Sequence, residues 1–251
     1  MHRFLAELGN YSEGTMNVRS AVSSVERNFH NHGLRAAVYD AAVRAANAFV
    51  TWKNLQCIVI TGPKPEYANV EPPYRHVVLD REALLSFSET DEYELQREFV
   101  TEALDKGDEC HAILHGDELA SYGWYSRRPT LLNDALRVHF SREYMYMFKG
   151  FTLHKHRGHR LHAIGMTLAL MKYRAAGYKG LVSIVERNNV DSLKSCYRMG
   201  YVPCGNIRYV KLAGTYLIRP DAACKTFGFD LQRVSSTPEN DSTSLVAASD
   251  R

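Results

Sequence analysis

The sequence has few features of a disulfide-rich or membrane-spanning protein. Its five cysteines are scattered over 251 residues and include no C-x-x-C pair, so neither a disulfide framework nor a zinc ribbon is indicated. No apolar run approaches the roughly 18 residues that a membrane span needs. The first residues include Glu7 and a polar stretch where a signal peptide has its apolar region. We therefore expect reduced thiols, no membrane span and a cytoplasmic location.

Acidic residues are scarce in one part of the chain. Between residues 137 and 225 there are sixteen Lys and Arg against four Asp and Glu, a net charge of +12, whereas the rest of the chain carries −9. Such an excess favours a polyanionic ligand, although lysines on solvated helix faces account for part of it. Within this basic part, the segment HKHRGHRLHAIG (residues 154–165) holds four histidines and two glycines.

The apolar pattern divides the chain into three parts. Residues 1–72 are predicted to form an N-terminal helical extension, with helical spacing from Asn17 to about Gln56 and a proline-rich linker at 62–73. The helical stripe fits packing on the protein's own domain better than a membrane surface. Residues 73–232 alternate strand and helix signals and predict a mixed α+β domain. Residues 233–251 are polar and predict a disordered tail.

Within the domain, turn and capping residues delimit the predicted elements. In chain order these are a helix from Thr90 to Gly107, a hairpin over 110–126 with its turn at 115–118, a strand at 143–154, a helix from Leu161 to Gly177, a strand at 180–186, a helix from Asn188 or Asn189 to Gly200, and strands at 206–214 and 215–219. Spacing predicts that the helix after Leu161 buries Leu161, Ile164, Leu168, Met171 and Ala175.

The segment 154–165 has three candidate ligands. Its histidines suggest a metal, but it offers no carboxylate or cysteine, and its two arginines repel a cation. A nucleic acid fits the charge, yet no recognisable reading element is present. An anion fits the order of elements, because a strand, a turn at Gly158 and a helix start bring N–H groups and a positive dipole end together. We expect an anion and neither a metal nor a nucleic acid; the alternative is a helix with a basic exposed first turn.

Two stretches resemble the GNAT superfamily of N-acyltransferases. RGHRLHA (157–163) is similar to its R-x-x-G-x-G/A pyrophosphate loop. VERNNVDSLKSCYRMGY (185–201) is similar to the strand and helix that follow, with Asn189, Ser192, Gly200 and Tyr201 at the family's spacing. The resemblance covers about residues 74–231. It implies a GNAT-like mixed sheet of six to seven strands flanked by helices, in which acyl-coenzyme A binds between two splayed parallel strands and an amine receives the acyl group directly.

The resemblance also implies a set of binding residues. The main chain near Phe151, Thr152 and Leu153 bonds the pantetheine arm, and Asn189 and Ser192 lie on the arm's other side. The pyrophosphate is cradled by Arg157 and by the main-chain amides of Gly158, His159, Arg160, Leu161, His162 and Ala163. The family's two small loop positions hold Arg160 and His162 here, so an acyl carrier protein remains an alternative donor.

The catalytic residues are less clear from the pattern. Cys196 stands where many members have the tyrosine that protonates the departing thiolate, with Tyr197 next to it; a buried cysteine is more often plain packing. Glu186 is the first candidate for the base that deprotonates the amine and His154 the second. Glu186 could equally be a paired surface carboxylate.

The sequence says less about the acceptor amine and the oligomeric state. Tyr122, Trp124, Tyr125 and Tyr209 could line an acceptor pocket or belong to the core. The sequence thus predicts an acetyl- or longer acyl-coenzyme A-dependent N-acyltransferase acting on a small-molecule amine, and it is compatible with a homodimer. The alternative is a coenzyme A-binding regulatory module without turnover.

Overall fold

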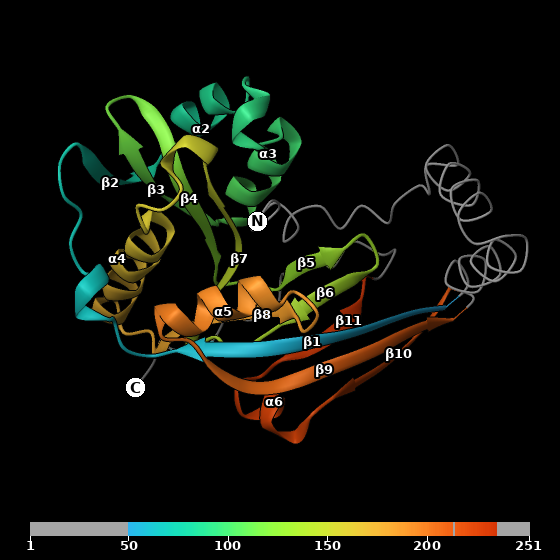
Figure 1. Cartoon of the computed structure of the whole chain (residues 1–251). Coiled ribbons are helices and arrows are strands. Elements are labelled where there is room, and N and C mark those ends of the chain that lie inside the picture. Colours follow the sequence, from blue (N-terminus) through green and yellow to red (C-terminus); the bar gives the residue numbers. More distant parts are fainter. Residues whose placement is uncertain (1–49, 213, 235–251) are drawn as a thin grey trace, which may run out of the picture.

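The structure is a computed structural model that describes residues 50–212 and 214–234 (Figure 1). The helices predicted before residue 50 and the tail predicted from residue 235 lie outside the described residues. Among the described residues there are an eight-stranded sheet, in the order β10-β9-β1-β8-β7-β4-β3-β2, and a three-stranded sheet, in the order β11-β6-β5. The mixed α+β class is confirmed, with a few more strands than expected.

Strands and helices alternate in only part of the domain, because five strands follow one another between residues 109 and 152. The strands are β1 (Val50–Ile60), β2 (Tyr74–Leu79), β3 (Glu109–His115), β4 (Glu118–Ser126), β5 (Thr130–Asn133), β6 (Leu136–His139), β7 (Tyr144–Thr152), β8 (Gly180–Glu186), β9 (Val202–Leu212), β10 (Thr215–Pro220) and β11 (Asp230–Arg233). The helices are α2 (Arg81–Phe87), α3 (Arg97–Lys106), α4 (Leu161–Ala175), α5 (Val190–Met199) and α6 (Ala222–Thr226), with 3-10 turns η2 (Pro65–Tyr67), η3 (Asp91–Tyr93) and η4 (His154–His156). All neighbouring strands are antiparallel except β7 and β8, which are parallel.

The helix predicted to reach Gln56 is wrong for residues 50–56, which belong to strand β1. This strand pairs with β8 on one side and β9 on the other, so it lies inside the sheet. Leu55, Cys57 and Ile58 are fully buried, because α4 and α5 cover one face of the strand and the small sheet and α6 cover the other. A strand of the sheet therefore lies before the boundary that the sequence predicts at residue 72.

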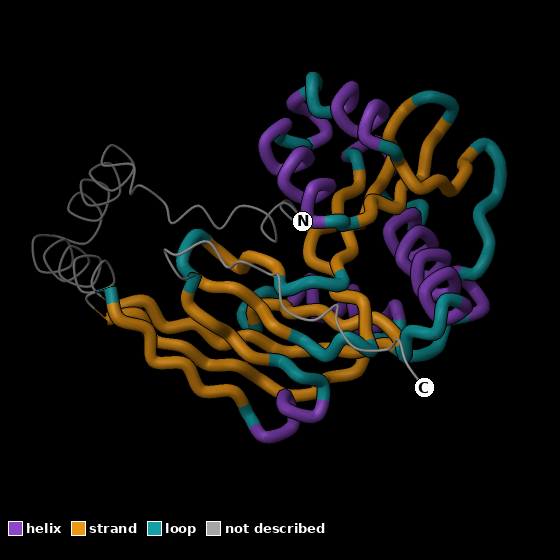
Figure 2. Tube along the Cα trace, turned by 180° about the vertical axis from the view of Figure 1, so that it is seen from behind, coloured by secondary structure: helices purple, strands orange, loops and turns teal. Residues whose placement is uncertain are grey.

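The layers on the two faces of the large sheet differ. Helices α4 and α5 pack on one face, over β1, β7 and β8. On the other face, α2 and α3 cover the half formed by β3, β4 and β7, whereas the small sheet and α6 cover β1, β8 and β9. Seen from behind, the helices gather around the β2–β4 half, and strands make up most of the other (Figure 2). No helix among the described residues is long and apolar enough to cross a bilayer.

Two helices differ from their predicted form. The helix expected from Thr90 begins at Arg97, because Glu94 has a left-handed backbone, with φ 52°, that separates η3 from α3. Helix α4 has the predicted span, but Met171 and Ala175 are exposed and Ile164 and Leu168 are only half-buried. Small residues such as Ala163 and Gly165 are buried against the strands instead. A Cβ at Gly165 would lie 3.5 Å from Ile113 Cγ1, so small residues bring this helix close to the sheet.

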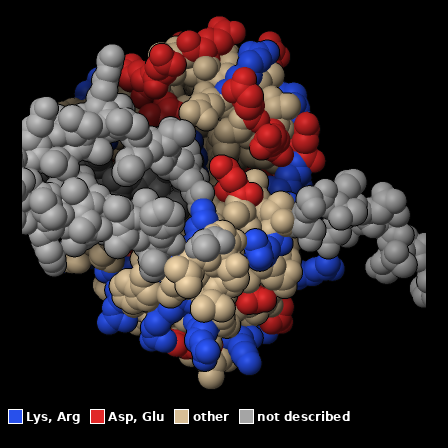
Figure 3. Space-filling model, turned by 90° about the vertical axis from the view of Figure 1, so that its right-hand side faces the viewer, with Lys and Arg blue, Asp and Glu red and all other residues tan. Residues whose placement is uncertain are grey.

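Charge is unevenly distributed over the molecule, and its cysteines are free. Cys57 and Cys224 approach with 3.6 Å between their sulfur atoms. Residues 80–106, around α2 and α3, contain nine Asp and Glu against three Lys and Arg. Figure 3 shows acidic side chains over the upper part of one face, where α2 and α3 lie, and basic ones over its lower part. The molecule therefore has an acidic end and a basic remainder.

Candidate functional site

The two parallel strands separate soon after they meet. Pairing between β7 and β8 covers residues 144–146 and 180–182, whereas β7 continues to Thr152 and β8 to Glu186. Beyond the ladder, Ser183 Oγ donates to Met147 O at 2.7 Å. The pairing of β7 with β4 extends to Thr152, and that of β8 with β1 extends to Glu186. Each strand is thus supported on its outer edge while its inner edge is left open.

Some of the main-chain groups at the end of β7 that are predicted to bind the pantetheine arm form hydrogen bonds within the protein instead. Leu153 N–H donates to Ala120 O at 2.9 Å, and Phe151 O accepts from Ser121 Oγ at 2.7 Å. Thr152 O accepts from Arg157 Nε at 3.2 Å. Because main-chain groups alternate along a strand, Gly150 and Thr152 turn theirs toward the β8 side.

The predicted phosphate loop is an exposed basic turn at the start of α4. Arg157, Gly158, His159 and Arg160 are all exposed. Gly158 has φ 90°, and a Cβ there would meet no atom within 4 Å. Arg160, the residue before α4, has φ 61° and makes no side-chain capping bond. The first amides of α4 are therefore uncapped by this residue, at the positive end of the helix dipole.

The bulky residue in the customary small position is matched by a glycine on the neighbouring strand. The imidazole of His162 lies against Gly150 of β7, where an added Cβ would be 2.4 Å from His162 Cε1 and 2.9 Å from Met147 Cε. Burial of this ring lowers the pKa of His162 to about 4, so the imidazole is neutral at pH 7. Gly150 thus makes room for His162, and the sequence pattern alone does not show this pairing.

The start of α5 follows the sequence prediction closely. Asn189 is the N-cap, and its side chain accepts from Ser192 N–H at 3.1 Å. Asn189 N–H donates to Glu186 O at 2.9 Å, which ties the helix start to the end of β8. Ser192 is buried in the first turn. Both residues lie where β8 leaves β7.

Cys196 and Tyr197 point to different surroundings on α5. Cys196 packs against the core between α4, α5 and the sheet, and burial raises the pKa of its thiol to about 12. Tyr197 is exposed, and its hydroxyl donates to Gln56 Oε1 of β1 at 2.8 Å. The structure therefore separates these neighbouring candidates.

The two candidate bases are found at the ends of the diverging strands. Glu186 Oε1 lies 2.5 Å from the ammonium of Lys53 on β1, so it is an ion-paired carboxylate. His154 is exposed and follows Leu153 at the start of η4. The structure brings the predicted phosphate loop, the Asn189 cap and both candidate bases to the region where β7 and β8 separate.

The sequence does not indicate that the hydroxyl groups of two tyrosines are buried in the same core. Tyr125 on β4 and Tyr201 after α5 both lie in the core under α4 and α5. Among the described residues, neither hydroxyl has a hydrogen-bond partner, which is uncommon for buried polar groups. Tyr122, Trp124 and Tyr209, the other acceptor candidates, belong to packed cores. Strand alternation alone does not separate these roles.

Comparison with known proteins finds solved structures that are similar to this one. No protein-family model matches the sequence, and no curated protein matches it. A GCN5-related N-acetyltransferase-like protein from Streptococcus suis has 13% identity and a TM-score of 0.44, over 70% of this chain and 68% of that one. An acetyltransferase of the GNAT family from Colwellia psychrerythraea has 16% identity and a TM-score of 0.46, over 70% and 62%. A GCN5-related N-acetyltransferase from Sphaerobacter thermophilus has 7% identity and a TM-score of 0.45, over 74% and 57%.

The arrangement implied by the sequence resemblance is visible in this chain itself. Its large sheet is mixed, its one parallel pair among the described strands is β7 and β8, and that pair separates after three residues of pairing. The loop that resembles the pyrophosphate motif follows β7, and the helix with the Asn189 motif follows β8. The chain thus has the splayed mixed sheet that the GNAT superfamily resemblance implies.

Proposed function

We propose that the chain is an acyl-coenzyme A-dependent N-acyltransferase that passes an acetyl or longer acyl group directly to a small-molecule amine. The proposal depends mainly on one observation: β7 leaves its parallel partner after Tyr146 and leads into a basic turn before a helix whose N-cap residue makes no side-chain capping bond. An extended ligand arm needs an unpaired strand edge, and its phosphates need a positive helix end. Here β7 has the unpaired edge and leads into the positive start of α4.

The residues present fit such a co-substrate. In this proposal the amides of residues 158–163 hold the pyrophosphate, and Arg157 and Arg160 add charge-assisted bonds. The arm follows the inner edge of β7 at Gly150 and Thr152, with Asn189 and Ser192 across from it. The net charge of +12 between residues 137 and 225 favours a ligand with several phosphates.

The acceptor amine must lose its proton before it attacks the thioester. We assign Glu186 as the group that takes this proton, and His154 as the second candidate. The ammonium of Lys53 already lies 2.5 Å from Glu186 Oε1, which shows that this carboxylate accommodates an alkylammonium group. A cationic acceptor would compete with Lys53 for the same position.

One observation favours a second candidate function, a coenzyme A-binding module without turnover. The thiol at Cys196 has a pKa of about 12, whereas an ordinary thiol has a pKa near 8.5. Proton transfer from Cys196 to the departing thiolate would therefore be unfavourable by about 3.5 pKa units. A module that only binds coenzyme A would not need this step.

Titration calorimetry and a thiol-release assay test the proposal together. We expect acetyl-coenzyme A to bind saturably, and free thiol to appear in the presence of amines from a panel of small primary amines. Saturable binding without thiol release would identify the non-catalytic module. A chain that shows no saturable binding of acetyl-coenzyme A or a longer acyl-coenzyme A contradicts both functions.

A further inference from the structure

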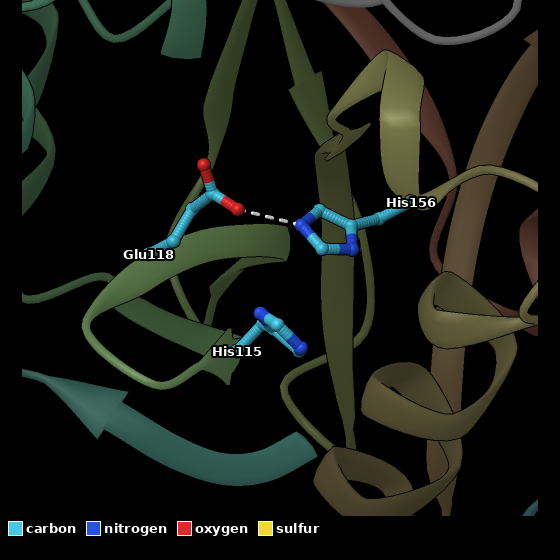
Figure 4. Close-up of side chains that lie close together, drawn as sticks. All are labelled: His115, Glu118 and His156. Atoms are coloured by element: carbon cyan, nitrogen blue, oxygen red, sulfur yellow. Dashed lines mark hydrogen bonds and ion pairs between the residues drawn. The ribbon is translucent and has the colours of Figure 1, made fainter. Parts of the chain in front are cut away.

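Three metal-ligating side chains meet at the tip of the β3–β4 hairpin (Figure 4). His115 ends β3 and Glu118 begins β4, and the two are cross-strand partners. His156 lies in η4, between β7 and α4. One ligand atom from each residue lies within 4.8 Å of the other two. The fold thus brings the imidazole of His156 to an imidazole and a carboxylate of the hairpin, which lies about forty residues earlier in the chain.

We propose that His115, Glu118 and His156 bind one divalent transition-metal ion, and that Zn²⁺ matches this donor set best. Two imidazole nitrogens and one carboxylate oxygen are the ligands of zinc sites that keep a fourth position open. The segment 154–165 lacks a carboxylate, which is why the sequence predicts no metal; folding supplies Glu118 from the hairpin. The site does not depend on acyl-coenzyme A binding.

The side chain of His156 is already oriented for this role. Its Nδ1 lies 3.1 Å from Tyr74 Oη, and its Nε2 lies 2.7 Å from Glu118 Oε2. In the metal-free chain, Nε2–H donates to Glu118 and Nδ1 accepts from the Tyr74 hydroxyl. A metal ion would take the place of the proton on Nε2, and Nδ1–H would then donate to Tyr74, as in second-shell partners of metal-bound histidine. His156 is buried, which limits its other orientations.

The distances require only a small rearrangement. Two ligands about 2.0–2.1 Å from a tetrahedral zinc ion are about 3.3 Å apart. The bond between His156 Nε2 and Glu118 Oε2, at 2.7 Å, must therefore open by about 0.6 Å. His115 is exposed and packs against the rings of Tyr74 and His156, with both centroid distances 5.2 Å. Its side chain can turn toward the other two.

One cation opposes the metal. The ammonium of Lys155 forms an ion pair with Glu118 Oε1 and is exposed. A metal ion at Glu118 would share this carboxylate with Lys155 or displace it. Removing the lysine charge should therefore strengthen metal binding, whereas removing an ordinary surface lysine should not.

A second cluster of two histidines and a glutamate shows what a filled network looks like. His111 Nδ1 lies 3.1 Å from His76 Nε2, and His111 Nε2 lies 3.1 Å from Tyr173 Oη. Glu109 holds Lys172 and Tyr173. In the part of the chain that the structure describes, only His115, Glu118 and His156 bring three ligand atoms within 4.8 Å of one another, so this second cluster offers no equivalent site. Among the described residues, no hydrogen bond engages the nitrogens of His115.

The test is a titration of the chelator-treated full chain with ZnCl₂, followed by calorimetry and by thermal unfolding. We expect one saturable site and a rise in Tm, because an ion that binds the folded chain stabilises it. A parallel titration with Fe²⁺ under anaerobic conditions decides between the two ions that favour this ligand set. Tighter Fe²⁺ than Zn²⁺ binding would overturn the assignment to zinc.

Variants locate the ion. Glu118→Gln and His115→Ala change side chains at the hairpin tip and should abolish the saturable site, while Tyr74→Phe should weaken it about 10- to 100-fold. Lys155→Met should tighten it, and Lys194→Met on α5 should leave it unchanged. His76→Ala is the matched histidine control and should also leave it unchanged. Circular dichroism confirms that each variant is folded.

Two results would overturn the proposal. One is the absence of saturable Zn²⁺ binding to the folded wild-type chain. The other is binding that survives both Glu118→Gln and His115→Ala, which would place the ion at other histidines or cysteines of the chain.

Discussion

Helices α4 and α5 each follow one of the two parallel strands, yet their first turns are held differently. At α5, the Asn189 side chain accepts from Ser192 N–H, so the chain satisfies its own helix start. At α4, Arg160 makes no side-chain cap, and the helix start is held instead by His162 packing on Gly150. Packing holds the helix in place without using its amides. The comparison shows how one helix start can be rigid and still offer N–H groups to a ligand.

Disturbing the packing contact at α4 should lower the unfolding free energy more than removing the cap of α5. Gly150→Ala places a methyl group where His162 and Met147 lie, and overpacking of this kind costs about 1–3 kcal/mol of unfolding free energy. Urea unfolding followed by circular dichroism measures the loss. In the double variant Gly150→Ala with His162→Ala, the combined loss should be smaller than the sum of the single losses. Strict additivity would mean that the two side chains are not in contact.

Charge at the two helix starts should affect ligand binding unequally. On the proposed function, Arg160→Glu puts a negative charge beside the phosphates and should weaken acetyl-coenzyme A binding about 10- to 100-fold. Lys194→Glu makes the same charge change on α5, where the helix start is capped, and should change the dissociation constant by less than about twofold. Calorimetry measures both. Equal losses would place the phosphates elsewhere.

The cap of α5 should have a moderate effect on stability alone. Asn189→Ala removes the bond to Ser192 N–H and should lower the unfolding free energy by about 1 kcal/mol. The neighbouring Asn188 is exposed and is not the N-cap, so Asn188→Ala should cost only a few tenths of that amount. If both variants lose the same stability in urea, then the cap bond does not stabilise the helix.

The packing at α4 should also produce a pH dependence that α5 lacks. The pKa of His162 is about 4 in the folded chain against a model value of 6.5, so between these pH values the unfolded chain binds more protons. Its contribution to stability is therefore present above about pH 6.5 and is lost as the pH falls toward 4. Urea unfolding at a series of pH values should show a shallower fall in the His162→Gln variant. An unchanged slope would contradict the burial of this ring.

Local patterns predicted many of the elements that position the site. The turn at residues 115–118, the strand that ends near Thr152 and the cap at Asn189 each depend on residues close together in the sequence. Turn and capping residues act through bonds within a few positions, so a single sequence is enough to find them. The exposed turn at Gly158 belongs to the same class.

Features that depend on distant partners could not be predicted in this way. Residues 50–56 continue a segment that the sequence predicts as helical, whereas in the structure they pair with β8 and β9 as a strand. The match between Gly150 and His162 and the approach of Glu118 to His156 also require the folded sheet. In the last case a signal was present, because the predicted turn already placed Glu118 beside His115.

The position of β1 has a consequence for the order of folding. Strand β1 joins β8 to β9, but these partners lie more than a hundred residues later in the chain. During translation, the residues of this buried strand are therefore synthesised long before those of either neighbouring strand. Such pairings close long loops and slow folding, and they leave an apolar segment exposed in the meantime. The half of the sheet that completes the proposed ligand site should form last.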